Sequence, residues 1–372
     1  INLGGMFTEI DLTNGMTLEV LFDSDYFSGE MVLFDSNGNW LTNAEAHEWG
    51  DAMAFSYDIS SDGRYSIQFN SWNWMPYWYS VSIYDSSGGG GIPTSGSDYS
   101  YYANGVYIET DGDVTIATPA GSERWWYNNN TGGGIEVYSG GNVKLSGLDL
   151  SSNYKFGTYL YGAGAGKTTT LADLHVENNG NADNHEPGIE VRMRGPVTMT
   201  NLNVQNNHGD GVRVDNCDEY SGVCRGSGEV VLNGSDNYFN QNHYNSDGYE
   251  TGYGLYIKTI GLVTLSNFTI ENHVNAGIYI TRPEYPVGSV LPVGGVTITS
   301  SGGYMNFVRD IWVGEGVYID TYGPVNLSSL KVQNSGGTGI IISNEDAALA
   351  QPVTLTNVSV ESVRGRGFDI NS

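Results

Sequence analysis

The side chains best suited to chemistry stand in a four-residue motif that recurs along most of the chain: glycine, an apolar residue, a variable residue and a second apolar residue. If each copy is a strand, the variable residue faces outward, because side chains alternate between the two faces of a strand. Two copies carry a glutamate there, Glu136 and Glu190, and paired carboxylates are the groups with which most glycosidases cleave sugar polymers. Other copies carry Arg213 or a tyrosine: Tyr107, Tyr159, Tyr256, Tyr279 and Tyr318.

The two glutamates are poorly placed for a shared reaction. They lie two copies apart, roughly 9.6 Å at the usual distance between paired strands, which is wide for a retaining glycosidase and at the limit for an inverting one. Tyr159 stands between them. Glu190 is instead expected to form a local ion network with Arg213 and Asp215. No catalytic residue is therefore predicted.

The tyrosine row has two interpretations. Tyr159, Tyr256, Tyr279 and Tyr318 could form a platform on which sugar rings stack, because flat amphipathic rings suit carbohydrate. Aromatic side chains on neighbouring strands also stabilise a sheet without any ligand. The sequence leaves both interpretations open.

The elements that carry these side chains follow from the repeat itself. Copies of the motif begin at Gly105, Gly134, Gly157, Gly188, Gly211, Gly254, Gly277, Gly316, Gly339 and Gly367, and every second interval is 23 residues. The short copies align without gaps and show three alternating segments, in one copy Ile189/Val191, Val197/Met199 and Leu202/Val204. A glycine seven residues into each (Gly141, Gly195, Gly261, Gly323) is expected to supply the bend between strands. Three strands per repeat predict one coil of a solenoid, and coils must stack to bury their apolar edges.

A polar corner follows the third segment of each coil. Its first residues, Asn178, Asn206, Gln241, Asn272 and Asn334, are predicted to form a hydrogen-bonded amide ladder along the stack. His208, His243 and His273 lie at or beside this corner. They are expected to end the ladder or face solvent rather than to bind metal, because no cysteine or second histidine stands at ligand spacing.

This repeat resembles the right-handed parallel β-helix family, the pectate-lyase-like superfold, over residues 105–372. The resemblance implies an all-β chain with about nine coils, but that fold carries lyases, hydrolases, phage tailspikes, adhesins and structural proteins alike. A polygalacturonase-type site would need an Asn-Thr-Asp triplet, an Asp-Asp pair, a His-Gly and an Arg-x-Lys. Of these the chain has only His208-Gly209.

Residues 1–87 show alternating segments joined by polar turns, which predict a β-sandwich. The segments at 33–39, 63–67 and 79–83 resemble bacterial pre-peptidase C-terminal domains, which are sandwiches of exported proteins. Relatives of that sandwich sometimes bind calcium, which makes Asp23, Asp25 and Asp35 candidate ligands. Against calcium, a calcium loop starting at Asp35 would lack its closing glutamate, since position 46 is Ala46.

Two further features lie near the end of this region. Residues 88–104 are rich in Gly and Ser and predict a linker that also covers the N-terminal end of the solenoid. Before it comes an aromatic cluster with three interpretations, a protein interface, a glycan-stacking site or ordinary core. Its residues are Trp72, Trp74, Tyr77 and Trp78.

Composition indicates a secreted protein. The formal net charge of −27 excludes nucleic-acid binding through a basic face. The two cysteines, Cys217 and Cys224, are predicted to form a disulfide, which implies an oxidising compartment. No run of 18 apolar residues is present to span a membrane, and the start at Ile1 indicates a mature product whose leader has been removed. We expect an extracellular or cell-surface location.

The functional prediction is an extracellular structural or adhesive protein that associates head-to-tail with copies of itself into a filament. It rests on the missing catalytic set and on the last coil, which stops after one strand without a cap, since bare strand edges pair with other chains. Ile1, Leu3, Phe368 and Ile370 are the expected assembly residues. The alternative is a secreted polysaccharide-binding or polysaccharide-degrading protein, a lyase or glycoside hydrolase. No cofactor is predicted, although calcium is possible.

Overall fold

The computed structural model describes residues 6–12, 17–23, 29–46, 53–71, 80–85, 105–110, 112–118, 124–130, 132–162, 166–181, 185–217, 219–220, 223–224, 228–242, 252–283, 294–344 and 351–372. These residues form strands and connections and include no helix, so the predicted all-β class is confirmed. Among the described residues, no helix is long and apolar enough to cross a membrane.

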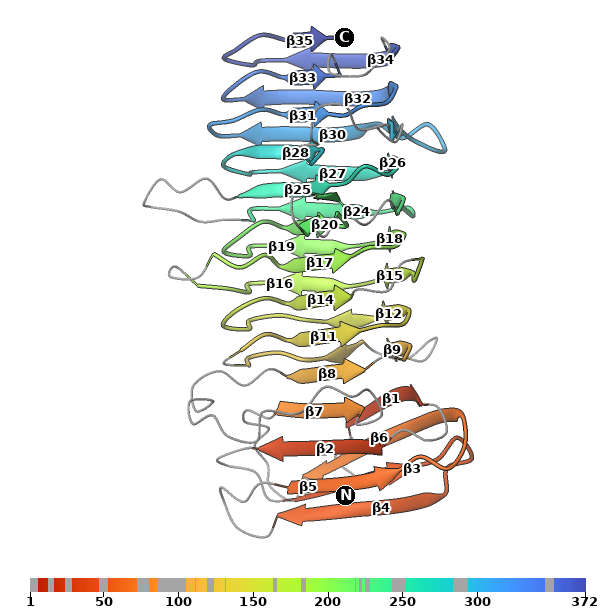
Figure 1. Cartoon of the computed structure of the whole chain (residues 1–372). Coiled ribbons are helices and arrows are strands. Elements are labelled where there is room, and N and C mark those ends of the chain that lie inside the picture. Colours follow the sequence, from red (N-terminus) through yellow and green to blue (C-terminus); the bar gives the residue numbers. More distant parts are fainter. Residues whose placement is uncertain are drawn as a thin grey trace.

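From Val106 onward the chain winds into stacked coils with three strand-bearing faces (Figure 1). The first face continues through parallel pairs along a sheet of thirteen strands. Its coil strands are β8 (Val106–Thr110), β11 (Ile135–Ser139), β14 (Thr158–Gly162), β17 (Ile189–Met193), β20 (Val212–Asp215), β25 (Tyr253–Lys258), β28 (Ala276–Thr281), β31 (Val317–Asp320), β33 (Ile340–Ser343) and β35 (Phe368–Asn371).

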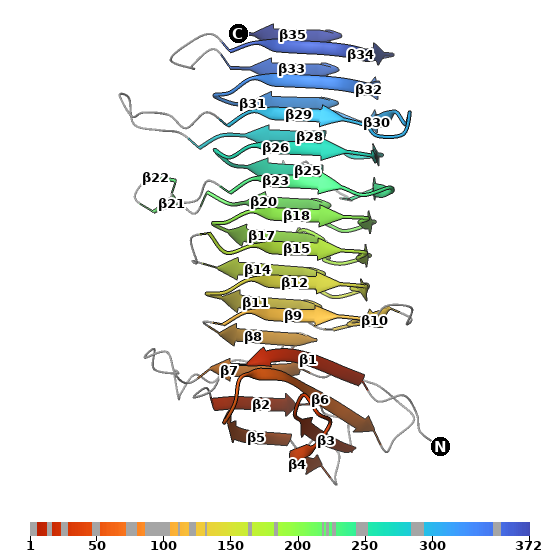
Figure 2. The same cartoon turned by 90° about the vertical axis from the view of Figure 1, so that its right-hand side faces the viewer.

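The second and third faces are also parallel and belong to one sixteen-stranded sheet, because β32 (Val325–Ser335) spans both (Figure 2). The second face begins with β9 (Val114–Ala117), β12 (Val143–Ser146), β15 (Thr169–Ala172), β18 (Val197–Thr200), β23 (Val230–Asn233), β26 (Val263–Ser266) and β29 (Val296–Thr299). The third begins with β10 (Trp125–Trp126), β13 (Leu148–Asp149), β16 (His175–Glu177), β19 (Asn203–Gln205), β24 (Asn237–Asn240), β27 (Phe268–Glu271) and β30 (Asn306–Ile311). Both end on β32 and β34 (Val353–Glu361).

The predicted alternation is confirmed in the core. Ile189, Val191, Val197, Met199 and Val204 are all fully buried, and equivalent residues of the other coils join them in one hydrophobic cluster along the stack. Each coil therefore buries its apolar edges against its neighbours, as stacking of a solenoid requires.

The glycines of the corner after the first face serve a different purpose from the predicted one. Gly141, Gly195 and Gly323 are not among the residues with positive φ. A Cβ at these positions would lie 2.3, 1.7 and 1.8 Å from the carbonyl oxygens of Gly112, Lys167 and Gly294 in the preceding coil. Glycine is required here because two backbones approach closely, and not because the chain needs a left-handed bend.

The N-terminal region forms the predicted sandwich from seven strands, beginning with β1 (Met6–Leu12). One antiparallel sheet has the order β1-β6-β3-β4, with β3 (Gly29–Phe34), β4 (Trp40–Ala46) and β6 (Gly63–Ser71). Facing it are β2 (Thr17–Asp23), β5 (Met53–Asp58) and β7 (Ser80–Asp85). Leu18, Met31, Leu33, Phe55 and Ile67 share the hydrophobic cluster of the coils.

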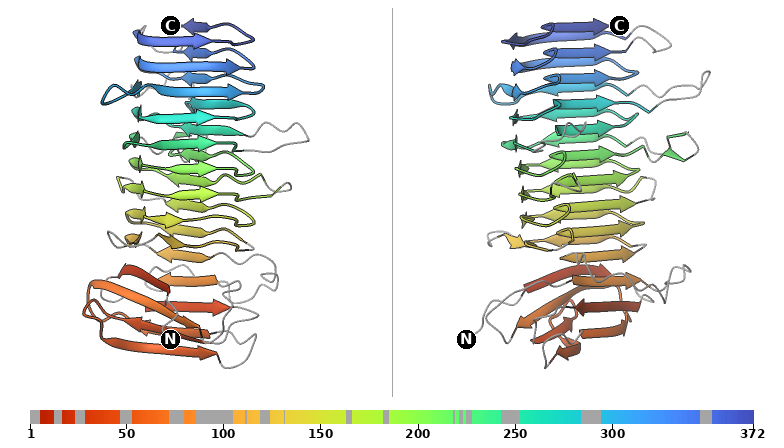
Figure 3. Two further views of the ribbon diagram at one scale, coloured as in Figure 1. Left: turned by 180° about the vertical axis from the view of Figure 1, so that it is seen from behind. Right: turned by 90° about the vertical axis from the view of Figure 1, so that its left-hand side faces the viewer.

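The sandwich is joined to the coils by a shared sheet. β7 pairs in parallel with β8, so the order β5-β2-β7 continues directly into the first face. The sandwich thereby closes one end of the stack, while β35 is the last strand at the other (Figure 3). The predicted linker, residues 88–104, lies outside the described residues.

Candidate functional site: the outward and polar surfaces of the coils

The amide ladder exists one residue further along the chain than predicted. Asn130, Asn153, Asn179, Asn207 and Asn242 are buried, and the Nδ2 of each of the first four donates to the Oδ1 of the next at 2.7, 2.8, 2.9 and 2.7 Å. Each Oδ1 also accepts the backbone N–H of the preceding ladder residue, at 3.0–3.3 Å. The ladder therefore satisfies buried backbone and side-chain groups together.

The predicted ladder residues instead form the turn beside it. Asn178, Asn206, Gln241, Asn272 and Asn334 have φ between 47° and 60°, the left-handed region that asparagine tolerates better than most residues. Because these residues turn the chain, the residue that follows each of them points inward. Their own amides make peripheral bonds, such as Asn206 Nδ2 to Glu177 Oε1 at 3.1 Å and Asn272 Nδ2 to Asn240 Oδ1 at 2.8 Å.

His273 takes the ladder position after Asn242, which confirms that this histidine ends the ladder. Its imidazole is fully buried, with Nδ1 3.2 Å from the Asn242 carbonyl oxygen and Nε2 3.4 Å from that of Phe239. Burial lowers the pKa of His273 from 6.5 to about 4, although the charges of Asp210 and Glu271 act in the opposite direction. The ring is therefore neutral in the folded protein at neutral pH. The third predicted corner histidine, His243, lies outside the described residues.

This burial predicts a loss of stability on acidification. The folded-state pKa of His273 lies below its unfolded value, so its contribution is complete above about pH 6.5 and is lost as pH falls towards 4. Unfolding by denaturant at several pH values should show a fall of about 3 kcal/mol over this range relative to His273→Asn. Parallel stability curves for the two proteins would contradict the prediction.

The tyrosines of the first face split into two groups. Tyr256, Tyr279 and Tyr318 stack on one another, with centroids 5.6 and 4.6 Å apart and ring planes within 7° and 9°. Arg213 lies over Tyr256 at 4.7 Å from the ring centre. Because the stacked faces are covered by their neighbours, these rings offer their edges and hydroxyls rather than a platform for sugars.

The second tyrosine group, nearer the sandwich, is arranged less regularly. Tyr138 lies 5.7 Å from Tyr107 and 6.0 Å from Tyr159, with the planes tilted by 42° and 49°. Burial raises the pKa of all three phenols, and the acceptors Glu109 and Glu136 add to the rise at Tyr107 and Tyr138. These hydroxyls are therefore protonated hydrogen-bond donors and are not poised as bases.

Two acids at the first face, Glu190 and Asp210, are buried, and the ion pairs that they form differ from the predicted network. Glu190 is 3% exposed and pairs with Arg192 at 2.6 Å. Arg213 pairs with Asp210 at 2.9 Å, and Asp210 also accepts the backbone N–H groups of Gly252 and Tyr253, both at 3.0 Å. The expected direct network of Glu190, Arg213 and Asp215 is therefore replaced by two pairs. Asp215 accepts the Cys217 N–H at 3.1 Å.

Glu136 and Glu190 are not brought together. Their outward positions lie on the two sides of Tyr159, because neighbouring strands place Glu136, Tyr159, Glu190 and Arg213 in that order along the first face. Glu136 Oε1 accepts the Tyr138 hydroxyl at 2.9 Å. The predicted separation by one tyrosine is confirmed.

One acid that sequence reasoning missed lies close to Glu190. Burial raises the pKa of Glu186, and the negative charge of Glu190 raises it further, while Lys155, Arg192 and Arg213 oppose the rise. A carboxyl group whose pKa is raised by burial beside a second carboxyl group is a common arrangement in acid catalysis. Glu186 precedes its glycine-led motif by two residues, outside the alternating segments, so no periodicity marked it.

Residues 104–284 match the family model described as a right handed beta helix region. No curated protein and no solved structure gives a match. The chain contains a right-handed parallel β-helix. The β-helix continues past the matched residues, because the pairing stays parallel through β33 and β35.

The remaining predicted sites are only partly described. Asp35 caps the turn between β3 and β4 by accepting the backbone N–H groups of Asn37 and Asn39 at 2.9 and 2.8 Å. The side-chain hydrogen bond from Asn39 Nδ2 to Asp35 Oδ2, at 2.8 Å, together with these backbone bonds lowers the pKa of Asp35. Within the described ranges, no three His, Cys, Asp or Glu side chains gather to hold a metal. Asp25 and the side chain of Asp23 lie outside the described residues, as do Trp72, Trp74, Tyr77, Trp78, Ile1 and Leu3.

The cysteines lie at a short hairpin that leaves the β-helix. β21 (Glu219–Tyr220) pairs antiparallel with β22 (Val223–Cys224). Cys217 is fully buried, and no cysteine among the described residues is free. Because the side chain of Cys224 is not described, the Cys217–Cys224 disulfide stays a prediction.

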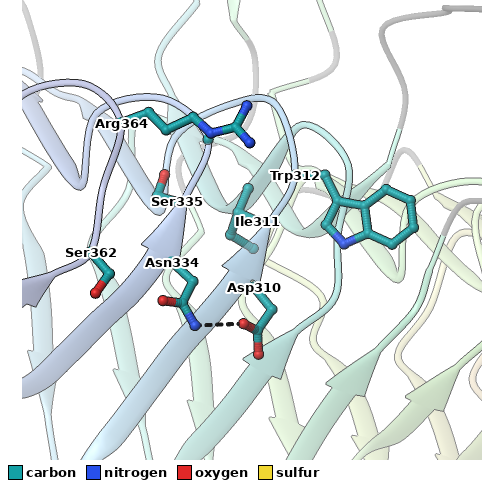
Figure 4. Close-up of a pocket in the computed structure, with 8 residues that line it drawn as sticks. Asp310, Ile311, Trp312, Asn334, Ser335, Ser362 and Arg364 are labelled. Atoms are coloured by element: carbon teal, nitrogen blue, oxygen red, sulfur yellow. Dashed lines mark hydrogen bonds between the residues drawn. The ribbon is translucent and has the colours of Figure 1, made fainter.

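Two shallow hollows lie along the third face. One, of about 440 Å³, is lined by residues that include Tyr304, Asn267 and Asp236. The other, of about 370 Å³, lies where three successive corners meet and includes Trp312, Asn334 and Arg364 (Figure 4). Sequence reasoning missed Trp312, although an indole in the corner after a strand is an unusual residue for a solvated turn.

Proposed function

We propose that this protein is an extracellular structural or adhesive scaffold that associates end to end with copies of itself. The observation that carries the proposal is the burial and pairing of two acids at the first face. Glu190 and Asp210 are buried and neutralised by Arg192 and Arg213 of their own coils, which leaves these carboxylates poorly placed to attack a substrate. Asp210 also accepts the backbone N–H groups of Gly252 and Tyr253 in the next coil, so it connects two coils of the rod.

The ladder and the tyrosine stack support the same function. Both run along the axis of the β-helix and link each coil to the next, through Asn179 and Asn207 inside and Tyr279 and Tyr318 outside. In a solenoid each repeat contacts mainly its neighbours, so such axial contacts determine the stiffness of the rod. We also propose that the N-terminal sandwich is related to the pre-peptidase C-terminal domains of exported proteins, in keeping with an extracellular location.

The distribution of charge supports contact with other surfaces. The net charge is −27, yet none of the eighteen outward positions of the second face carries Asp or Glu, and twelve carry Thr or Ser. They are Thr115, Ala117, Lys144, Ser146, Thr170, Ala172, Thr198, Thr200, Val231, Asn233, Thr264, Ser266, Thr297, Thr299, Asn326, Ser328, Thr354 and Thr356. This face can therefore approach another surface without placing carboxylates against it.

Electron microscopy and light scattering of the purified chain test the assembly. Phe368 and Ile370, the predicted assembly residues, are 40% and 38% exposed. We expect elongated end-to-end assemblies that are lost in Phe368→Glu/Ile370→Glu and kept in the matched control Thr198→Glu/Thr264→Glu on the second face. Monomers alone at all concentrations would overturn the assembly, and loss only in the threonine variant would replace it with side-by-side association.

The polysaccharide-degrading alternative is favoured by one observation, the raised pKa of Glu186 beside Glu190. Its test is a panel of neutral and acidic polysaccharides, with reducing ends and unsaturated products as the readouts. Turnover that is lost in Glu186→Gln and kept in Glu136→Gln, whose side chain bonds to Tyr138, would replace the scaffold with an enzyme. The scaffold predicts no turnover by the wild-type chain.

A further inference from the structure

The hollow beside Trp312 combines a fixed backbone with a free indole. The Trp312 side chain follows β30 and is 66% exposed. Its backbone is nevertheless held in the stack, because its N–H donates to the His273 carbonyl at 2.9 Å and the next N–H, of Val313, donates to the Val274 carbonyl at 3.0 Å. An exposed indole on rigid backbone forgoes the gain from burial, so a ligand that covers it would recover that gain.

The corner of the next coil is fitted closely against Trp312. A Cβ at Gly336 would lie 2.1 Å from the Trp312 carbonyl oxygen, so only glycine lets the two corners approach. The following corner is attached in turn, since the Arg364 N–H donates to the Ser335 carbonyl at 3.0 Å. Three successive corners therefore hold the backbone around the hollow in place before any ligand arrives, which lowers the entropic cost of binding.

Polar groups converge on the same hollow. Asp310 Oδ1 accepts the Asn334 Nδ2 at 2.8 Å, and both residues have left-handed backbone, with φ of 58° and 54°. Figure 4 shows this pair below Trp312 and the Arg364 guanidinium, with the Ser335 and Ser362 hydroxyls beside it. Among the described residues, no carboxylate forms an ion pair with Arg364. The hollow thus offers donors and acceptors, with the exposed indole of Trp312 at its edge.

These groups match the surface of a sugar ring. A pyranose presents C–H groups on its face, which pack on an indole, and hydroxyls at its rim, which both donate and accept hydrogen bonds. The volume of about 370 Å³ is at the small end for ligand pockets and suits one or two such rings. Asp310 and the overall charge of −27 disfavour a polyanion.

We propose that the hollow formed by Trp312, Asp310, Asn334, Ser335, Ser362 and Arg364 is a binding site for a neutral glycan. Trp312 supplies the stacking surface. Arg364 and Asn334 donate to sugar hydroxyls, and Asp310 accepts from them. This glycan site is the adhesive contact of the proposed scaffold, so the inference rests on the proposed structural or adhesive function. The site lies on the corner after the third face, and none of the tyrosines of the first face lines it.

Glycan-array binding followed by titration with the best oligosaccharide tests the site. We expect the full chain to bind neutral oligosaccharides, and Trp312→Ala and Arg364→Ala each to weaken binding at least tenfold. The matched control is Trp126→Ala, which removes an indole that is 60% exposed on the third face, outside the hollow. Unchanged thermal unfolding of the three variants, which alter exposed side chains, would show that the fold is intact.

The possible outcomes separate the site from the scaffold. Neutral-glycan binding that survives Trp312→Ala would overturn the site while leaving an adhesive protein that binds elsewhere. Binding of acidic glycans only, or of none, would overturn the site as well. None of these results depends on end-to-end assembly, which electron microscopy measures in a separate experiment.

Discussion

Asn207→Ala should lower the free energy of unfolding by about 4 kcal/mol. The Asn207 amide accepts the N–H and Nδ2 of Asn179 at 3.0 and 2.9 Å and donates to Asn242 Oδ1 and to the Val176 carbonyl at 2.7 and 3.2 Å. Alanine removes all four bonds and leaves buried groups of its neighbours unsatisfied, in a site too tightly packed for water to replace every contact. Denaturant unfolding followed by circular dichroism measures the loss.

The matched control is the neighbouring residue. Asn206 has a φ of 53° and bonds through its side chain to the half-buried Glu177. Asn206→Gly keeps the left-handed turn, because glycine adopts positive φ without strain, and should change stability by less than about 1 kcal/mol. Equal losses in the two variants would show that the ladder does not hold the coils together.

Gly195→Ala should destabilise the β-helix by a similar amount, about 4 kcal/mol. The new Cβ would lie 1.7 Å from the Lys167 carbonyl oxygen and 2.8 Å from its carbon. Both are backbone atoms of the preceding coil, so the clash can be relieved only by separating two coils at this corner and weakening their hydrogen bonds. Thermal unfolding by differential scanning calorimetry would report a large fall in the midpoint.

Gly166→Ala is the control variant that distinguishes a steric clash between coils from an effect of backbone conformation. Gly166 has a φ of 76°, and a Cβ there would have nothing within 4 Å. Alanine should therefore cost only the strain of a left-handed residue, about 1–2 kcal/mol. If Gly166→Ala proves as damaging as Gly195→Ala, the close approach of two coils is not needed to explain the damage at Gly195.

Local sequence patterns were sufficient to predict the three-strand coils. Apolar residues alternate with other residues along each segment, as in Val197/Met199 and then Leu202/Val204. This alternation shows which side chains point inward, because successive side chains of any strand point to opposite faces. The need to stack follows as well, since a single coil cannot cover its own apolar edges. The N-terminal sandwich was recognisable for the same reason, although β1 was missed and the continuous pairing of β7 with β8 was not foreseen.

The sequence did not show which residue of each corner pair forms the amide ladder, and the tertiary structure was needed to decide it. Both residues of a pair such as Asn206-Asn207 are amides, and their identities do not show which one points inward. The left-handed conformation of the first residue decides this, and that conformation is visible only in the folded chain. The same holds for Gly195, where the sequence shows a glycine but the reason for it lies in Lys167 of the preceding coil.

Sequence alone therefore determined the all-β class, the three-strand coil, the inward residues and the separation of Glu136 from Glu190 by a tyrosine. Only the tertiary structure decided the partners of the charged residues and the shape of the hollows. Asp210 reaches Gly252 and Tyr253 in the next coil, and Trp312 meets Asn334 and Arg364 from two later coils. Strand periodicity is a property of neighbouring residues, whereas these contacts join residues about one or two coils apart, across connections of unequal length.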